Sequence, residues 1–117
     1  MWTLWIPGWH PTPLNKLLRS HWGTAAKLKA KDRKIITTAA RAYGVAPAPG
    51  RRKVSLFLVL GKGQRAADPD AFWKSTLDAL VACGALKDDD RLHVELAPPA
   101  FARGDAPATF ITLEDVP

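Results

Sequence analysis

Runs of β-forming apolar residues predict four strands. Trp2 to Pro7 combines Trp, Thr, Leu and Ile, which favour a strand, and a turn containing Pro and Gly follows it. Lys53 to Leu60 is almost continuously apolar, so we expect it to lie centrally in a sheet. Two further strands are predicted at Arg91 to Leu96 and Thr109 to Leu113, separated by a loop rich in Pro, Ala and Gly.

The longest predicted element is a helix from about Trp22 to Tyr43, which Gly44 and a Pro-rich loop bring to an end. At 3.6 residues per turn, one apolar face collects Leu28, Ile35, Ile36, Ala39 and Tyr43. The basic residues fall on a different face. Asp32 falls on the apolar side, which leaves open an alternative in which the helix begins at Asp32 and uses it as an N-cap.

A second helix is predicted after Pro69 and Asp70, and Gly84 suits its C-terminal end. Its core stripe consists of Trp73, Leu77 and Leu80. Asn15 to Ser20 is expected to form a basic loop or a single turn. The order β-α-β-α-β-β indicates a small single α/β (α+β) domain over residues 1–117, with a mixed sheet of about four strands and two main helices.

Length and cysteine content narrow the class of protein. A chain of 117 residues suits one domain. Its one cysteine, Cys83, cannot form an internal disulfide, which fits a reducing compartment. The apolar N-terminus has no basic segment typical of a signal peptide, and no apolar run reaches the roughly 18 residues of a membrane helix. We therefore expect a soluble, cytoplasmic protein.

The charges are divided unevenly along the chain. Residues 15–65 carry thirteen Lys or Arg against one acid, and residues 66–117 carry four bases against ten acids, within a net charge of +6. This division favours a basic surface for a polyanion and a separate acidic site. The alternative is an ordinary basic protein whose charges are simply solvated.

The acidic half contains a distinctive cluster. Six acids fall within 23 positions: Asp68, Asp70, Asp78, Asp88, Asp89 and Asp90. Two carboxylates about 5 Å apart repel by roughly 3 kcal/mol at an effective dielectric near 20, and a hard divalent cation relieves this repulsion. Oxygen ligands without a convincing His or Cys set favour Mg²⁺, with Mn²⁺ as an alternative, over zinc. Such an ion polarises a phosphate and activates a water molecule, and Lys74 would help to neutralise the developing charge.

Each part of the cluster also has a purely structural interpretation. Lys74 and Asp78 have the spacing of a surface ion pair on a helix. Asp70 could cap the helix, and Asp88 to Asp90 could form a solvated turn. His10, His21 and His93 lack metal-ligand spacing among themselves, and we interpret them as structural or phosphate-contacting. The residues from Gly61 to Gly63 lack the spacing of a phosphate-binding loop, so no nucleotide cofactor is expected.

The spacing of the acidic residues resembles that of the RusA-type Holliday junction resolvases. That family shares Asp-x-Asp-Asn, a Lys four residues after the second Asp, then Asp-Ala-Leu, Gly and Asp-Asp. This chain has Asp68-Pro69-Asp70, Lys74, Asp78-Ala79-Leu80, Gly84 and Asp88-Asp89 at matching spacing. Upstream, Asn15, Arg19 and the His21-Trp22 pair precede a basic helix, so the similarity extends from about Asn15 to Leu96. Ala71 stands where the family usually has Asn.

The resemblance implies a specific site and assembly. By position, Asp68, Asp70 and Asp89 match the catalytic, metal-binding carboxylates, and Lys74 matches the catalytic lysine. The family is homodimeric, uses Mg²⁺ or Mn²⁺ and nicks opposed strands of a four-way DNA junction. For this chain we expect DNA contacts from Asn15, Lys16, Arg19, Lys27, Lys31, Lys34 and Arg65. Trp22 is a candidate for stacking on an unpaired base.

Three functions remain open from the sequence. The first is a metal-dependent endonuclease that resolves Holliday junctions in DNA recombination and repair. The second is a catalytically weakened relative that only binds junction DNA, which Ala71 keeps open because it lacks the family's side-chain amide. The third is a basic nucleic-acid-binding module whose acids are structural. Divalent-dependent nicking separates the first from the others, and preference for junctions over duplex separates the second from the third.

Overall fold

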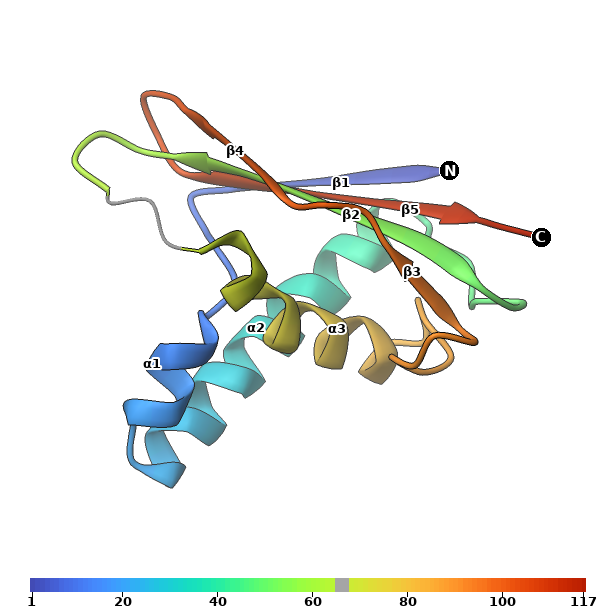
Figure 1. Cartoon of the computed structure of the whole chain (residues 1–117), viewed down its shortest axis with the longest axis horizontal. Helices are drawn as coiled ribbons and strands as arrows, with labels where there is room; N and C mark the ends of the chain where they lie inside the picture. The colour runs from blue at the N-terminus through green and yellow to red at the C-terminus, as the bar shows by residue number, and fades with distance from the viewer. Residues whose placement is uncertain (65–67) are drawn as a thin grey trace.

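The computed structural model of the chain describes residues 1–64 and 68–117 (Figure 1). Its elements are β1 (Trp2–Pro7), α1 (Leu14–Arg19), α2 (Trp22–Ala42), β2 (Arg52–Leu60), the 3-10 helix η1 (Pro69–Phe72), α3 (Trp73–Ala82), β3 (Val94–Leu96), β4 (Ala100–Arg103) and β5 (Ala108–Asp115). Arg65, one of the expected DNA contacts, lies outside the described residues. The expected α+β class is confirmed.

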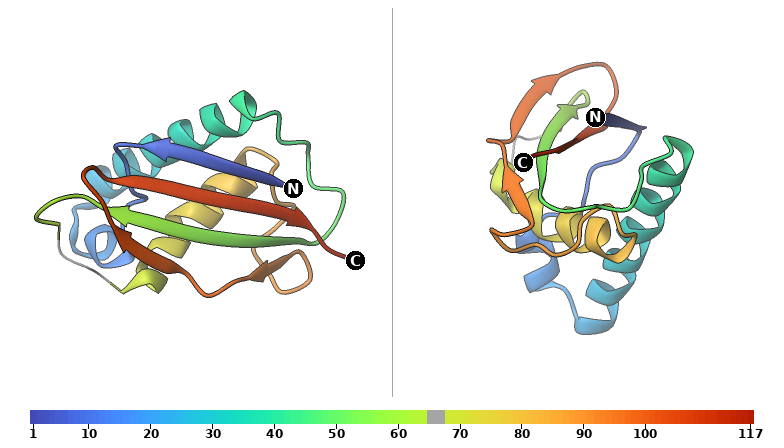
Figure 2. Two further views of the ribbon diagram at one scale, coloured as in Figure 1. Left: turned by 90° about the horizontal axis from the view of Figure 1, so that it is seen from above. Right: turned by 90° about the vertical axis from the view of Figure 1, so that its right-hand side faces the viewer.

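The strands form one five-stranded mixed sheet in the order β1-β5-β2-β3, and β4 also pairs with β2 (Figure 2). β5 runs antiparallel to β1 and to β2, whereas β3 and β4 both run parallel to β2. β2 is therefore central, as its almost continuous apolar sequence predicts. β3 and β4 follow one another along the same side of β2, because they pair with its two ends.

All the helices lie on one face of the sheet (Figures 1 and 2). Alternate residues of β2, including Val54, Leu56 and Leu58, point into this face and are buried. They meet Ile36 of α2 and Leu80 of α3 in one hydrophobic core. None of the helices in the described residues has the length and apolar character needed to cross a membrane.

The structure contains two elements that the sequence pattern does not predict. β4 lies within the segment expected to be a loop, and it raises the number of strands from about four to five. Residues 15–20 were expected to be a loop or single turn, but α1 makes a short helix there, with Leu17 buried. β3 begins at Val94 and not at Arg91, because residues 91–93 form a turn whose backbone N–H groups are held by Asp90.

Asp32 is a buried structural carboxylate in the middle of α2. The helix begins at Trp22, and the His21 ring accepts a hydrogen bond from Gly23 N at 3.2 Å as its N-cap, so the alternative start at Asp32 is wrong. Asp32 is 2% exposed and accepts three hydrogen bonds. The donors are Trp9 Nε1 (3.2 Å), the backbone N of Thr12 (2.8 Å) and Ser75 Oγ (2.6 Å). These donors satisfy the buried charge and explain its place on an apolar face.

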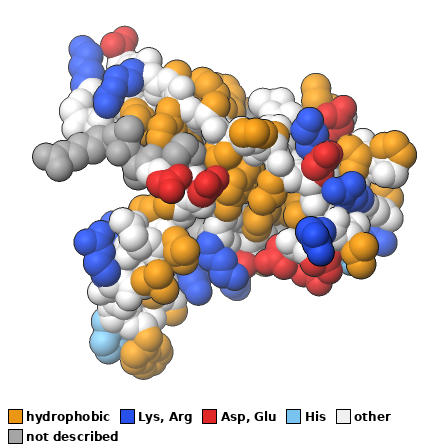
Figure 3. All heavy atoms as spheres, viewed as in Figure 1, with side chains coloured by type: hydrophobic (Ala, Val, Ile, Leu, Met, Phe, Trp, Pro, Cys, Tyr) orange, Lys and Arg blue, Asp and Glu red, His pale blue; other side chains and the backbone are white. Residues whose placement is uncertain are grey.

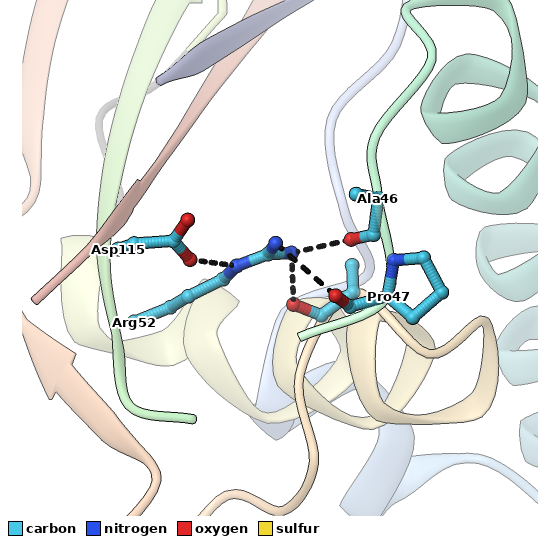
Figure 4. Close-up of polar contacts among 5 residues, drawn as sticks. Ala46, Pro47, Arg52 and Asp115 are labelled. Atoms are coloured by element: carbon cyan, nitrogen blue, oxygen red, sulfur yellow. Dashed lines mark hydrogen bonds and ion pairs between the residues drawn. The ribbon is translucent and has the colours of Figure 1, made fainter. Parts of the chain in front are cut away.

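Arg52 joins the sheet to the loops beside it (Figure 4). Its side chain is fully buried, and its Nε donates to Asp115 Oδ1 at 2.7 Å. Its Nη1 donates to the carbonyl oxygens of Ala46 at 2.8 Å and Ala85 at 3.0 Å. The guanidinium also lies 4.7 Å from the centre of the Trp2 ring. This basic residue therefore belongs to the core and not to a DNA-binding surface.

Candidate functional site

Asp68 and Asp70 flank the first turn before α3. Asp68 is the N-cap of η1, and its Oδ1 accepts a hydrogen bond from Asp70 N at 3.1 Å. Both residues are exposed. The sequence suggested Asp70 as the cap of this helix, but the capping residue in the structure is Asp68. One carboxylate oxygen of Asp68 and both of Asp70 make no other hydrogen bond within the described residues, which leaves them accessible to a cation.

Lys74 and Asp78 form an ion pair along the exposed face of α3. Lys74 Nζ lies 3.2 Å from Asp78 Oδ1, with side chains 52% and 36% exposed. Asp70, Lys74 and Asp78 are spaced four residues apart. The pair therefore continues the helix face that Asp70 begins, because residues four apart lie on the same face of a helix. A pair this exposed stabilises the helix by only a few tenths of a kcal/mol. The lysine is thus available to exchange its partner for a phosphate.

The second group of acids lies beyond the other end of α3. A cavity of about 400 Å³ is lined there by Asp78, Asp88 and Asp89, and by Lys29 and Arg33 of α2. The packing of α2 against α3 brings these two bases to the acidic residues. None of these five residues is fully buried. Opposite charges therefore line one open depression, and a phosphate would meet both kinds of charge there.

The structure does not gather Asp68, Asp70 and Asp89 into one ligand set. Asp68 and Asp70 precede α3, whereas Asp89 follows it, and a helix of ten residues is about 15 Å long. In Figure 3 acidic side chains accordingly occupy separate places on the surface shown. Within the described residues, one set of three has ligand atoms within 4.8 Å of one another, namely Asp88, Asp90 and His93.

Asp90 and His93 form the most compact part of that set. The His93 ring donates from Nδ1 to Asp90 Oδ1 at 2.6 Å, and the backbone N atoms of Leu92 and His93 donate to the same oxygen. The hydrogen bond from the His93 side chain, followed by the charge of His93 and the two backbone donors, holds the pKa of Asp90 below its ordinary value of 3.8. The sequence interpretation missed this group, although Asp-x-Asp-x-x-His spacing was available as a signal.

The expected DNA-binding residues that the structure describes lie on α1 and α2. All six are exposed: Asn15, Lys16, Arg19, Lys27, Lys31 and Lys34. Trp22, at the start of α2, is 79% exposed. Figure 3 shows basic side chains on the part of the surface formed by α1 and the start of α2, with acidic side chains across a hollow from them. Because α1 packs against η1 and α2 packs against α3, this basic surface borders the acidic residues that precede α3.

Comparison of the sequence with protein-family models and with curated proteins finds no match.

Proposed function

We propose that the chain is a metal-dependent DNA endonuclease of the RusA Holliday junction resolvase type, which acts in DNA recombination and repair. One observation carries the proposal. The exposed carboxylates of Asp68 and Asp70 and the exposed Lys74 follow one another at the start of α3, beside a basic surface on α1 and α2. Carboxylates hold a divalent ion, and the basic surface holds the phosphates next to it.

The donor set fits the proposed metal. Mg²⁺ is commonly bound by one or two carboxylates and keeps several waters, so Asp68 and Asp70 provide sufficient ligands. Both are exposed, and both offer oxygen atoms only. When bound, the ion would supply a Lewis acid for the phosphate and lower the pKa of a water molecule. Mn²⁺ has the same ligand preference. Asp89 is not part of a compact ligand set with Asp68 and Asp70 in the described residues, and its metal-binding role is part of the proposal.

The remaining roles fall to residues of the chain itself. Lys74, which pairs with Asp78, would exchange this partner for the phosphate and neutralise the negative charge that develops on it. Lys16, Lys27 and Lys31 would hold phosphates of the junction arms. Two opposed cuts need two sites, so we propose a homodimer of this chain. A DNA substrate and the lone cysteine agree with a cytoplasmic location.

A second candidate function is binding of junction DNA with weakened catalysis. Ala71 supports it, because a partly buried methyl group stands where the family has an amide that could orient a ligand or a water. The absence of Asp89 from a compact ligand set with Asp68 and Asp70, within the described residues, supports it as well. Both observations lower the expected rate of cleavage without weakening the basic surface.

The deciding experiment is a nicking assay on a synthetic four-way junction, with and without Mg²⁺, beside a linear duplex of the same sequence. Paired nicks in the junction that require the metal support the nuclease. Preferential binding of the junction without nicks supports the second candidate. Equal binding of junction and duplex without nicks would leave a basic nucleic-acid-binding module and contradict both. Asp105→Asn, a change at an exposed acid in the turn between β4 and β5, is the control variant for this assay, and it should behave like the unmodified chain.

A further inference from the structure

A second cavity lies between the segment after β1 and the helices. Its volume is about 390 Å³, at the lower end of the range for small-molecule sites, which is about 300–1,000 Å³. Residues 9–13 form one wall, Leu28 and Lys31 of α2 another, and Phe72 of η1 a third. Lys16 of α1 also lines it. Phe72 follows Asp70 by two residues, so the cavity adjoins the proposed catalytic loop.

The wall formed by residues 9–13 is held in place by buried polar contacts. The carboxylate of Asp32, which is 2% exposed, accepts hydrogen bonds from Trp9 Nε1 and from the backbone N of Thr12. Ser75 Oγ donates to the same carboxylate from α3. A carboxylate has about four acceptor positions, so three donors leave one free. A loop fixed in this way can receive a ligand without a large ordering cost.

His10 fixes the same wall from the other side. Its Nε2 lies 2.7 Å from the carbonyl oxygen of Val59, which requires that Nε2 donates and leaves Nδ1 as an acceptor in the neutral ring. Its ring meets Phe72 edge to face, with centroids 6.3 Å apart. The cavity therefore combines flat apolar surfaces with a few fixed polar atoms, a combination that suits an aromatic heterocycle.

Two lysines place positive charge at the same cavity. Lys16 and Lys31 are exposed residues from two different helices, and both line it. A ligand with an aromatic ring in the cavity and a phosphate beside it would satisfy the apolar walls and the two ammonium groups together. A nucleotide has this combination of chemistry. Either a free nucleotide or a nucleotide within a DNA strand could supply it.

We propose that this cavity receives one unstacked nucleotide from the branch point of the DNA, with its base between Trp9, Leu28 and Phe72 and its phosphate on Lys16 and Lys31. The inference rests on the proposed function and deepens it, because it names a base pocket beside the catalytic loop. Extruding a base costs least where pairing and stacking are already interrupted, as at a branch point. The pocket would thereby favour branched DNA over duplex.

The test uses a four-way junction with 2-aminopurine next to the branch point and a fluorescein at one arm, in a buffer without divalent ions. Fluorescein anisotropy reports binding, and 2-aminopurine emission reports unstacking. We expect binding to raise 2-aminopurine emission severalfold. Leu28→Trp, which fills the cavity, and the double variant of Lys16→Ala with Lys31→Ala should abolish that rise. Lys62→Ala removes an exposed lysine in the turn after β2 that does not line the cavity, and this variant should keep the rise.

The outcomes separate this inference from the proposed function. Failure of the wild-type chain to bind the junction in the anisotropy measurement would overturn the proposed function and the pocket together. Binding of the wild-type chain without a rise in 2-aminopurine emission would overturn the pocket alone. The pocket would also be overturned if the rise persists in both cavity variants while their thermal unfolding is unchanged. In a second arm, the free 2-aminopurine deoxynucleotide replaces the junction. Saturable binding there, without unstacking in the junction, would assign the cavity to a free nucleotide and contradict the inference.

Discussion

Ser75 of α3 donates its hydroxyl hydrogen bond to the buried carboxylate of Asp32 on α2, with an Oγ–Oδ2 distance of 2.6 Å. The two residues are 43 positions apart, and their contact joins the helix with the expected DNA-binding residues to the helix with the expected catalytic lysine. Any displacement of one helix against the other would break a hydrogen bond to a buried charge.

We predict that Asp32→Asn lowers the free energy of unfolding by about 2 kcal/mol, since hydrogen bonds to charged groups contribute roughly 1.5–3 kcal/mol and the amide NH₂ would face a donor. Urea denaturation measures this loss. Asp105→Asn, an exposed acid, should change stability by no more than about 0.5 kcal/mol. Equal stability of the two variants would show that the three donors to Asp32 contribute little.

We predict that Arg52→Ala destabilises the domain by about 3 kcal/mol or more. It removes the donor to the carbonyl group of Ala46 and to the buried carbonyl group of Ala85, and it opens a cavity; a buried unsatisfied acceptor alone costs about 1–3 kcal/mol. Asp115→Asn should cost less than about 1 kcal/mol, because the Asp115 side chain is 53% exposed. Denaturant midpoints compare the two variants, and a larger loss for Asp115→Asn would contradict this ranking.

Sequence patterns predict the elements whose burial follows a local period. The apolar strand β2, the long helix α2 and the stripe of Trp73, Leu77 and Leu80 are found where expected, and all three stripe residues are buried. β4 was missed because it has four residues and exists through its pairing with Phe57 to Leu60 of β2, a partner far away in the sequence. The place of Asp32 on the apolar face cannot be explained from the sequence for a similar reason, since its donors come from two other segments, residues 9–12 and α3.

The candidate site shows the same division between local and distant information. Spacing along α3 predicts the Lys74–Asp78 pair, which the structure contains. Spacing alone did not predict the contact between Asp90 and His93, because the turn that creates it was assigned to a strand. How near Asp89 comes to Asp70 depends on the path of the chain after α3, and no periodic pattern encodes that path. The metal-binding role of Asp89 therefore stays a prediction.

We predict that His93→Ala raises the pKa of Asp90 toward its ordinary value, because the hydrogen bond from the His93 ring is the largest cause that lowers it. An acid whose pKa is depressed by folding contributes stability above its unfolded pKa, and that contribution disappears as the pH falls through the folded pKa. The wild-type stability should therefore decline more than that of His93→Ala as the pH falls below 3.8. NMR titration of the Asp90 carboxyl carbon measures the pKa directly, and an unchanged value in His93→Ala would contradict the assignment.

We predict that Asp70→Asn and Lys74→Ala abolish Mg²⁺-dependent nicking while junction affinity is largely kept. Removing an acid reduces repulsion with phosphate, so Asp70→Asn could even bind more tightly. Nicking and anisotropy measured on the same samples separate the two effects. His93→Ala is the matched comparison and should nick normally, since His93 lies beyond the opposite end of α3 from Asp70. If His93→Ala is inactive and Asp70→Asn is active, the metal belongs to Asp88, Asp90 and His93.

The last prediction concerns the basic surface and the assembly that it requires. Each phosphate neutralised by a lysine contributes about −0.9 to the slope of log affinity against log salt. Lys27→Glu combined with Lys31→Glu should therefore weaken junction binding and flatten that slope by about 2, if each lysine neutralises one phosphate. Lys62→Glu, a change at an exposed lysine of the turn after β2, is the control and should alter the slope less.

The same charge reversals should leave Mg²⁺ affinity unchanged, because neither lysine belongs to the proposed ligand set. A four-way junction has near two-fold symmetry, and one chain offers a single set of Asp68, Asp70 and Lys74, so paired cuts need two chains related by a two-fold axis. Sedimentation at micromolar concentration, with and without a junction, should therefore show a dimer. A chain that stays monomeric under both conditions could still bind branched DNA, but it could not make the paired cuts that define the proposed activity.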